Sequence, residues 1–145
     1  MFAPGEGRAA EMNQKQRAPV TARVKLTICT EERFFGPGVC ELLEKIGETG
    51  SIQAAAGRME MSYSKAWKIL KKAEEEMGTD LITRMSGGKN GGSSALTGAG
   101  KKAVQDFRGM EKKLAEYAEE LMQEHPGAFR AASPGESARE TVRER

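Results

Sequence analysis

A mainly α-helical domain with small β elements is predicted for this chain of 145 residues. Apolar residues recur at intervals of three and four along four segments between residues 37 and 125, which is the spacing of one helix face. Alternating apolar and polar residues mark a short strand near residue 25, and a Gly-rich stretch separates two further strand-like segments. The order of these elements predicts a winged helix-turn-helix with an N-terminal β-hairpin, a Gly-rich wing and a long C-terminal dimerisation helix.

Composition divides the chain into three parts. Residues 1–19 and 126–145 mix Gly, Pro, Ala and charges without periodicity, so we expect disordered tails around a folded domain at 20–125. No run approaches the ~20 apolar residues that span a bilayer, and no signal-peptide core is present, so we expect a cytoplasmic protein without membrane contact. Cys29, Cys40 and the single His125 lack zinc-ligand spacing, so we expect no metal and no cofactor.

The domain begins with a predicted hairpin and a scaffold helix. Residues 23–28 alternate, with Val24, Leu26 and Ile28 on one side, and residues 30–33 turn the chain back into a partner strand at residues 34–35. Pro37 suits the first position of a helix that ends at Gly47 or Gly50. Its apolar stripe is Val39, Leu42, Leu43 and Ile46. This helix is net acidic, so we interpret it as a scaffold helix that does not face DNA.

Residues 50–78 contain the predicted helix-turn-helix. Ser51 and Ser62 are suited to cap two helices, and residues 60–61 fit the short turn between them. The first helix carries the apolar positions Ile52, Ala55, Ala56 and Met59, and the second carries Ala66, Ile69, Leu70, Ala73 and Met77. The opposite face of the second helix carries Ser64, Lys65, Lys68, Lys71 and Lys72. Such a polar and basic face is what a recognition helix needs at base edges and phosphates.

Charge changes sign along this region. Residues 51–72 hold five basic residues and one acidic residue, whereas residues 73–82 hold four acidic residues and no basic one. The weak total charge of +2 therefore hides a positive stripe, which is the electrostatic footprint of a nucleic-acid-binding surface. A merely solvated amphipathic helix remains the alternative interpretation of the helix alone.

A wing and a long helix complete the predicted domain. Residues 81–85 and 95–96 flank the Gly-rich stretch 86–94, which lacks the residue order of a phosphate-binding loop. Arg84 and Lys89 beside it favour a flexible tip that reaches a phosphate or a minor groove. Thr97 caps a final helix of about 28 residues with a heptad-like stripe at Ala103, Phe107, Met110, Leu114, Tyr117 and Leu121. The first half of this helix could pack on the domain, and the second half then needs a partner, so the stripe predicts a dimer surface. Packing of the long helix on its own N-terminal hairpin is the alternative.

These residues together resemble a known family. The residues are Leu42 to Ile46, Gly50-Ser51-Ile52, Ala54 to Ala56, Met61-Ser62-Tyr63, Ala66-Trp67, Gly87-Gly88-Lys89 to Gly92, and Leu96-Thr97 with Ala99-Gly100. Their order and spacing resemble the N-terminal winged-helix domain of the ModE-type molybdate-responsive transcription regulators. The broader helix-turn-helix spacing is also similar to the LysR-type regulators, which are the alternative family.

The resemblance implies a homodimer that reads a palindromic operator in double-stranded DNA and regulates transcription. Its DNA-binding residues would be Gln53, Ser62, Tyr63, Ser64, Lys65, Lys68, Arg84, Lys89 and Asn90, and Trp67 would be buried. Its dimer would use the first and last helices, through Val39, Leu42, Phe107, Met110, Leu114, Tyr117 and Leu121. Tyr63 could equally close the edge of the core. The residues themselves, with a single His, no paired carboxylates in a plausible pocket and no nucleophile motif, predict that the protein is not an enzyme.

One departure from the family bears on sensing. Full-length members continue into small β-barrels that bind molybdate, whereas this chain continues into a tail rich in Pro, Gly, Arg and Glu. We therefore do not expect direct molybdate binding. A winged-helix protein-interaction module is the remaining alternative function.

Overall fold

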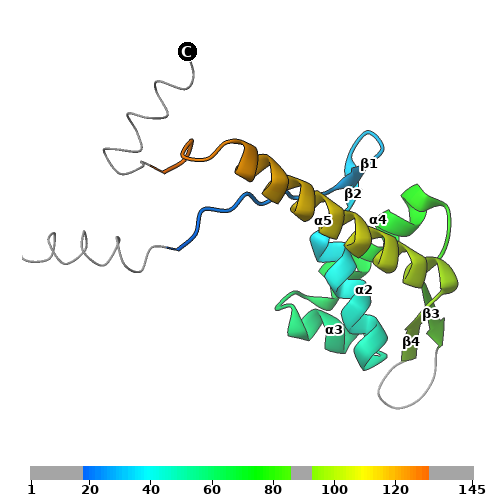
Figure 1. The fold of residues 1–145 in the computed structure, drawn as a ribbon. Helices are drawn as coiled ribbons and strands as arrows, with labels where there is room; N and C mark the ends of the chain where they lie inside the picture. Colours follow the sequence, from blue (N-terminus) through cyan, green and yellow to red (C-terminus); the bar gives the residue numbers. More distant parts are fainter. Residues whose placement is uncertain (1–17, 86–92, 131–145) are drawn as a thin grey trace, which may run out of the picture. The chain divides into compact units, whose positions relative to one another are not determined.

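The structure is a computed structural model and describes residues 18–85 and 93–130 (Figure 1). The contacts divide these residues into one unit at 24–116 and a second made of residues 18–23 and 117–130. The predicted wing tip and most of both predicted tails lie outside the described residues. The elements of the larger unit carry the helix-turn-helix and both hairpins.

The N-terminal hairpin is shorter than the alternating apolar and polar residues predicted. Strand β1 spans Ile28–Cys29 and pairs antiparallel with β2 at Arg33–Phe35. The expectation of a strand from residue 23 is wrong, since residues 18–27 form no regular structure and Val24 is exposed. The partner strand has only three residues before helix α2 begins at Pro37, so residues before Ile28 have no strand to pair with.

Helix α2 spans Pro37–Thr49 and supplies the centre of the core. Pro37 stands at its start, and Gly50 ends it in the left-handed conformation with φ 73°, where its N–H donates to the Ile46 carbonyl at 2.8 Å. Gly50 therefore terminates the helix, and Gly47 lies inside it. Leu42, Leu43 and Ile46 are all fully buried.

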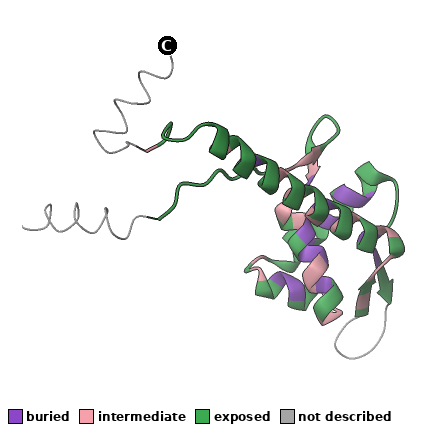
Figure 2. Ribbon diagram, viewed as in Figure 1, coloured by how far each residue is buried: buried purple, intermediate pink, exposed green. Residues whose placement is uncertain are grey.

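Helices α3 (Ile52–Arg58) and α4 (Tyr63–Met77) pack against α2. Their small side chains Ala55, Ala56 and Ala66 are all buried, and side chains of this size allow the backbones of packed helices to approach closely. Figure 2 shows buried and exposed bands alternating along α2 and α3, and the burial of residues along α4 alternates in the same way. The sequence prediction of both helices and of their apolar faces is confirmed, except that Met77 is exposed.

The wing is a two-stranded antiparallel hairpin. Strand β3 (Ile82–Met85) pairs with β4 (Ser93–Leu96), with Ile82 opposite Leu96 at its base. The Ser94 N–H donates to the Gly50 carbonyl at 2.8 Å, which fixes β4 to the end of α2. The hairpin is thereby held beside the helix-turn-helix.

Helix α5 spans Gly98–Glu124 and begins as predicted at Thr97, whose Oγ1 accepts the Gly100 N–H at 3.0 Å. In the larger unit, Phe107 packs on Phe35 of the hairpin with ring centroids 5.2 Å apart. Arg108 donates to both carboxylate oxygens of Glu44, at 2.6 and 3.2 Å. The first part of the helix therefore closes the core against α2 and the hairpin, as expected for its first half.

Two residues assigned to the dimer surface are instead core residues. Leu42 is 0% exposed and Phe107 is 2% exposed, so neither side chain is available to a second chain. Both lie on apolar stripes that the chain's own helices and hairpin cover, and a heptad-like spacing alone does not tell an internal contact from an external one. Met110, Tyr117 and Leu121 are exposed, whereas Val39 and Leu114 are half-buried.

Candidate nucleic-acid interface

The turn between α3 and α4 fixes how the second helix is presented. Glu60 adopts the left-handed conformation with φ 55°, and the next N–H, of Met61, donates to the Ala56 carbonyl at 3.0 Å. Ser51 Oγ accepts the Ala54 N–H at 3.1 Å, and Ser62 Oγ accepts the Lys65 N–H at the same distance. Both predicted caps are confirmed.

Four of the predicted DNA-binding residues lie at the start of α4. Gln53 on α3 and the residues from Ser62 to Lys65 are exposed, and Lys68 follows one turn later on the same helix. Tyr63 is 51% exposed, so it does not close the edge of the core. The Ser62 hydroxyl oxygen is engaged as the helix cap, which leaves its hydrogen as a donor for an external acceptor. Lys89 and Asn90 lie outside the described residues.

The basic residues of this region differ in their partners. Lys72 Nζ lies 2.8 Å from Glu32, and Arg58 lies 3.4 Å from Glu48. Within residues 18–85 and 93–130, no ion pair involves Lys65, Lys68 or Lys71. These three lysines are exposed on α4 and give its outer face a net positive charge.

Part of the acidic run at the end of α4 is engaged by other groups of the molecule. Glu74 is 6% exposed and turns into the molecule, where its Oε2 accepts the Leu81 N–H at 2.8 Å and the Ile82 N–H at 3.4 Å. Glu76 accepts the hydroxyl of Thr30 at 3.0 Å. Two of the four acidic residues, Glu74 and Glu76, thus bind other groups, whereas Glu75 and Asp80 are exposed.

Arg84 has a structural partner that the sequence prediction did not anticipate. Its guanidinium donates to Glu74 Oε1 at 3.1 Å, so Arg84 joins the base of the wing to α4. The side chain is still about one-third exposed, at 36%. Arg84 therefore orients the wing, and any contact it makes with a nucleic acid would have to share or replace the Glu74 bond.

The expectation that Trp67 is buried is wrong. Trp67 is 38% exposed, and the Lys71 ammonium lies 5.7 Å from the centre of its ring. Successive helix residues are rotated by about 100°, so the neighbour of the buried Ala66 lies at the side of α4 and not beneath it. Tyr63, Trp67 and Lys71 recur every four residues and form one exposed ridge of this helix.

Sequence reasoning missed Glu74 as the residue that anchors the wing. A pattern could have found it, because Glu74 continues the four-residue spacing of Ala66 and Leu70 and thus falls beside a core face. A carboxylate at such a position needs donors, and the backbone after the helix supplies them.

The described residues hold neither a candidate metal site nor a membrane-spanning helix. They contain no group of three or more His, Cys, Asp or Glu side chains that could hold a metal ion. No helix among them is long and apolar enough to cross a membrane.

This fold and exposed basic helix define the class of helix-turn-helix DNA-binding domains. Residues 39–101 match the family described as bacterial regulatory helix-turn-helix protein, lysR family. The chain thus carries a helix-turn-helix domain of the lysR type, from α2 to the start of α5.

Curated relatives are similar over the same region. The molybdenum transport protein ModE of Herbaspirillum seropedicae is 33% identical over 98 residues, which are 68% of this chain and 35% of that protein. The transcriptional regulator ModE of Haemophilus influenzae is 33% identical over 102 residues, 70% of this chain and 40% of that protein. The region of this chain that matches spans well under half the length of each of these relatives. The crystal structure of the CbnR_DBD-DNA complex has a TM-score of 0.49 at 20% identity and covers 61% of this chain and 97% of that chain.

Proposed function

We propose that this protein is a sequence-specific, DNA-binding transcription regulator that binds a palindromic operator as a homodimer in the cytoplasm. The observation that carries the proposal is the start of α4, where a capped helix-turn-helix presents exposed polar side chains together with Lys65 and Lys68. The matched lysR-type domain and the ModE relatives support the same class of protein. The proposal includes no catalytic activity.

The mechanism rests on two kinds of contact. Lys and Arg side chains neutralise phosphates and fix the register of the protein on the duplex, while side chains at the helix start read base edges in the major groove. Ser64 and Lys65 lie where base contact is expected, and Lys68 lies one turn further along for a phosphate. Lys89 and Asn90 of the wing would add contacts to the neighbouring backbone or minor groove.

We infer DNA binding for this chain, but not molybdate binding, from its similarity to these relatives. Their names refer to molybdenum transport and regulation, but the matched region covers at most 40% of the relatives described above. Residues 39–101 form the shared helix-turn-helix, so the activity inferred for this chain is the activity of that part.

Gel-shift titration tests the proposal directly, after an operator has been selected from random duplexes. We expect Lys65→Ala to weaken operator binding by roughly 5- to 100-fold and to relax base preference near the contacted position. Lys89→Ala should weaken operator and unrelated duplexes alike and lower the slope of log K against log salt by about 0.9. The matched control is Lys112→Ala, an exposed lysine of α5 away from this face.

Two outcomes would oppose the proposal. If both variants bind like the control at two salt concentrations, these residues do not belong to the interface. If the intact chain fails to retain any duplex or heparin at low salt, the winged-helix interaction module becomes the better interpretation.

A further inference from the structure

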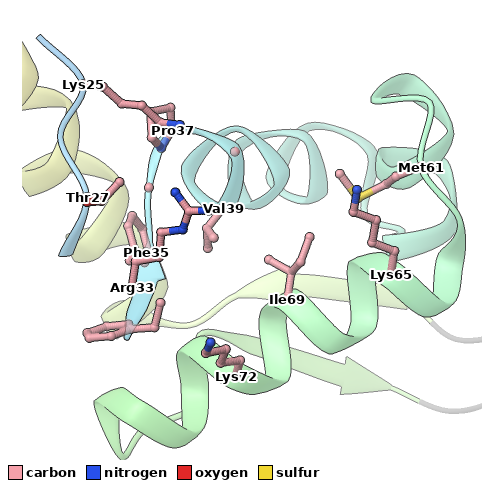
Figure 3. A pocket seen from close by; sticks show the side chains of 13 residues that line it. Lys25, Thr27, Arg33, Phe35, Pro37, Val39, Met61, Lys65, Ile69 and Lys72 are labelled. Atoms are coloured by element: carbon pink, nitrogen blue, oxygen red, sulfur yellow. The ribbon is translucent and has the colours of Figure 1, made fainter. Parts of the chain in front are cut away.

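A groove of about 610 Å³ lies on the larger unit between α4, the hairpin and the start of α2 (Figure 3). Its volume is within the range of about 300–1,000 Å³ that is usual for small-molecule sites. Val39, Met61 and Ile69 contribute apolar side chains from three different segments. In Figure 3, Ile69 rises from α4 toward Val39 on the opposite wall. The groove therefore offers an apolar surface large enough for a ring or a short hydrocarbon chain.

Basic side chains stand around this apolar surface. Lys25, Arg33, Lys65 and Lys72 line the groove, and none of its lining residues is acidic. Lys72 has a partner in Glu32, an exposed pair at 2.8 Å. Among residues 18–85 and 93–130, no ion pair involves Lys25, Arg33 or Lys65. Like charges that face one cavity repel one another, and a bound anion would relieve that repulsion.

We propose that this groove binds a small amphipathic anion, namely an aromatic or aliphatic body that carries one carboxylate or sulfonate, and that the bound anion weakens DNA binding. The apolar part would lie on Val39, Met61 and Ile69, and the anionic group would lie among the basic side chains. Apolar lining combined with a few charged groups is the usual composition of such sites. The charge of the lining selects anions over neutral or cationic molecules.

Lys65 connects the groove to DNA, and this half of the inference rests on the proposed function. Its side chain lines the groove, and the same residue stands in the first turn of α4 among the predicted reading residues. An anion that engages the Lys65 ammonium competes with phosphate or base acceptors for the same charge. Binding linkage is reciprocal, so duplex should weaken the anion by the same factor as the anion weakens duplex.

Fluorescence titration without DNA tests the site itself. The probe is anilinonaphthalene sulfonate, and its uncharged counterpart phenyl-naphthylamine reports the apolar contribution alone. We expect the sulfonate to bind the full chain, Arg33→Glu to weaken it by about tenfold or more, and Arg33→Lys to retain it. Lys112→Glu on α5 makes the same charge change outside the groove and should leave the affinity unchanged.

Arg33 is exposed, so its replacement should leave the fold intact, and far-UV circular dichroism with a thermal melt verifies this. Equal affinities of Arg33→Glu and Lys112→Glu for the sulfonate would overturn the proposed site. Equal binding of the charged and uncharged probes would also overturn it, because the basic lining would then contribute nothing. A change from dimer to monomer in Arg33→Glu, with the sulfonate affinity unchanged, would assign the groove to a second copy of the chain.

Repeating the titration with saturating duplex tests the coupling. We expect the sulfonate affinity to fall by the same factor by which saturating sulfonate weakens the duplex. An unchanged affinity, with duplex demonstrably bound, would overturn the coupling. If the chain binds no duplex at all, the proposed function fails, while the titration without DNA still decides the site.

Discussion

At the scale of single residues, Glu74 shows how one charge at the edge of a helix core positions the strand after that helix. Its carboxylate accepts two backbone N–H groups and the Arg84 guanidinium, so one side chain ties α4 to the first strand of the wing. A buried carboxylate is tolerable only when its oxygens are satisfied by donors, and all three donors come from residues 81–84. The wing therefore starts at a defined place relative to α4.

Replacement of Glu74 by Ala should lower the free energy of unfolding by about 2–4 kcal/mol. The variant leaves the buried N–H groups of Leu81 and Ile82 without acceptors and Arg84 without its partner. Urea unfolding followed by circular dichroism measures the loss. Glu75→Ala, at an exposed neighbouring position, should change stability by no more than about 0.5 kcal/mol, and equal losses in the two variants would contradict the anchoring role.

Gly100 permits a close approach that no other residue would allow. A Cβ atom on Gly100 would collide with the Leu81 carbonyl, whose carbon would lie only 3.1 Å away. Gly100→Ala should therefore destabilise the protein by about 1–3 kcal/mol. Gly109→Ala on the same helix meets nothing within 4 Å and should be neutral or stabilising by up to about 1 kcal/mol. Thermal melts compare the melting temperatures of the two variants. An unchanged melting temperature in Gly100→Ala would contradict the close contact.

The two cysteines should react at different rates. Burial raises the pKa of the Cys40 thiol to about 11, whereas Cys29 is exposed. Because the thiolate is the reactive form, we expect one thiol per folded chain to react with an alkylating reagent near neutral pH, and the second only on unfolding. Mass spectrometry of the modified peptides identifies the site. Fast modification of Cys40 in the folded chain would show that the core opens there.

At the scale of elements, the scaffold helix α2 and the start of α5 are joined by Glu44 and Arg108. The hydrogen bonds from Arg108 lower the pKa of Glu44 below its ordinary value of 4.5, against the opposing effect of burial. A carboxyl whose pKa is lower in the folded state stabilises the fold above its unfolded pKa, and this contribution is lost as the pH falls through the folded pKa. The pair therefore contributes at neutral pH and disappears in acid.

Glu44→Gln should accordingly cost stability at neutral pH and little at about pH 3. The pair is about one-third exposed, so solvent screening limits the expected loss at neutral pH to about 1 kcal/mol. Urea unfolding at the two pH values gives the difference, and Glu75→Gln is the control at an exposed position. A loss in Glu44→Gln that is independent of pH would show that packing, and not charge, joins the two helices.

At the scale of the whole molecule, the proposed homodimer depends on apolar side chains that remain exposed. In the larger unit these include Met110, beside an apolar hollow of about 190 Å³ that Met77 also lines. In the smaller unit they include Tyr117 and Leu121. Exposed apolar side chains within each unit mark candidate interfaces.

Sedimentation should find the intact chain as a dimer at concentrations on the order of tens of micromolar. Tyr117→Glu and Leu121→Glu place charges within the proposed interface and should shift the chain toward monomer. Lys113→Glu, an exposed position outside the predicted stripe, is the matched control. A wild-type chain that stays monomeric would contradict the dimer and leave the residues of α4 to bind DNA singly.

Local patterns determined much of this protein. Three kinds of feature depend only on residues that are close in sequence: the helix caps at Ser51, Ser62 and Thr97, the end of α2 at a glycine, and the apolar faces of α2, α3 and α4. The sequence alone therefore predicted the order and type of the helices and the exposed lysines of α4. The order of these elements also sufficed to predict the winged helix-turn-helix.

Tertiary structure decided which apolar stripes are covered and which charges have partners. Leu42 and Phe107 became core residues, Trp67 remained exposed, and Glu74 with Arg84 became the anchor of the wing, because each outcome depends on segments that are distant in sequence. Periodicity gives the direction of a side chain from its own helix but not what lies opposite. The groove shared by the hairpin, α2 and Lys65 of α4 exists for the same reason, since only the folded chain brings those residues together.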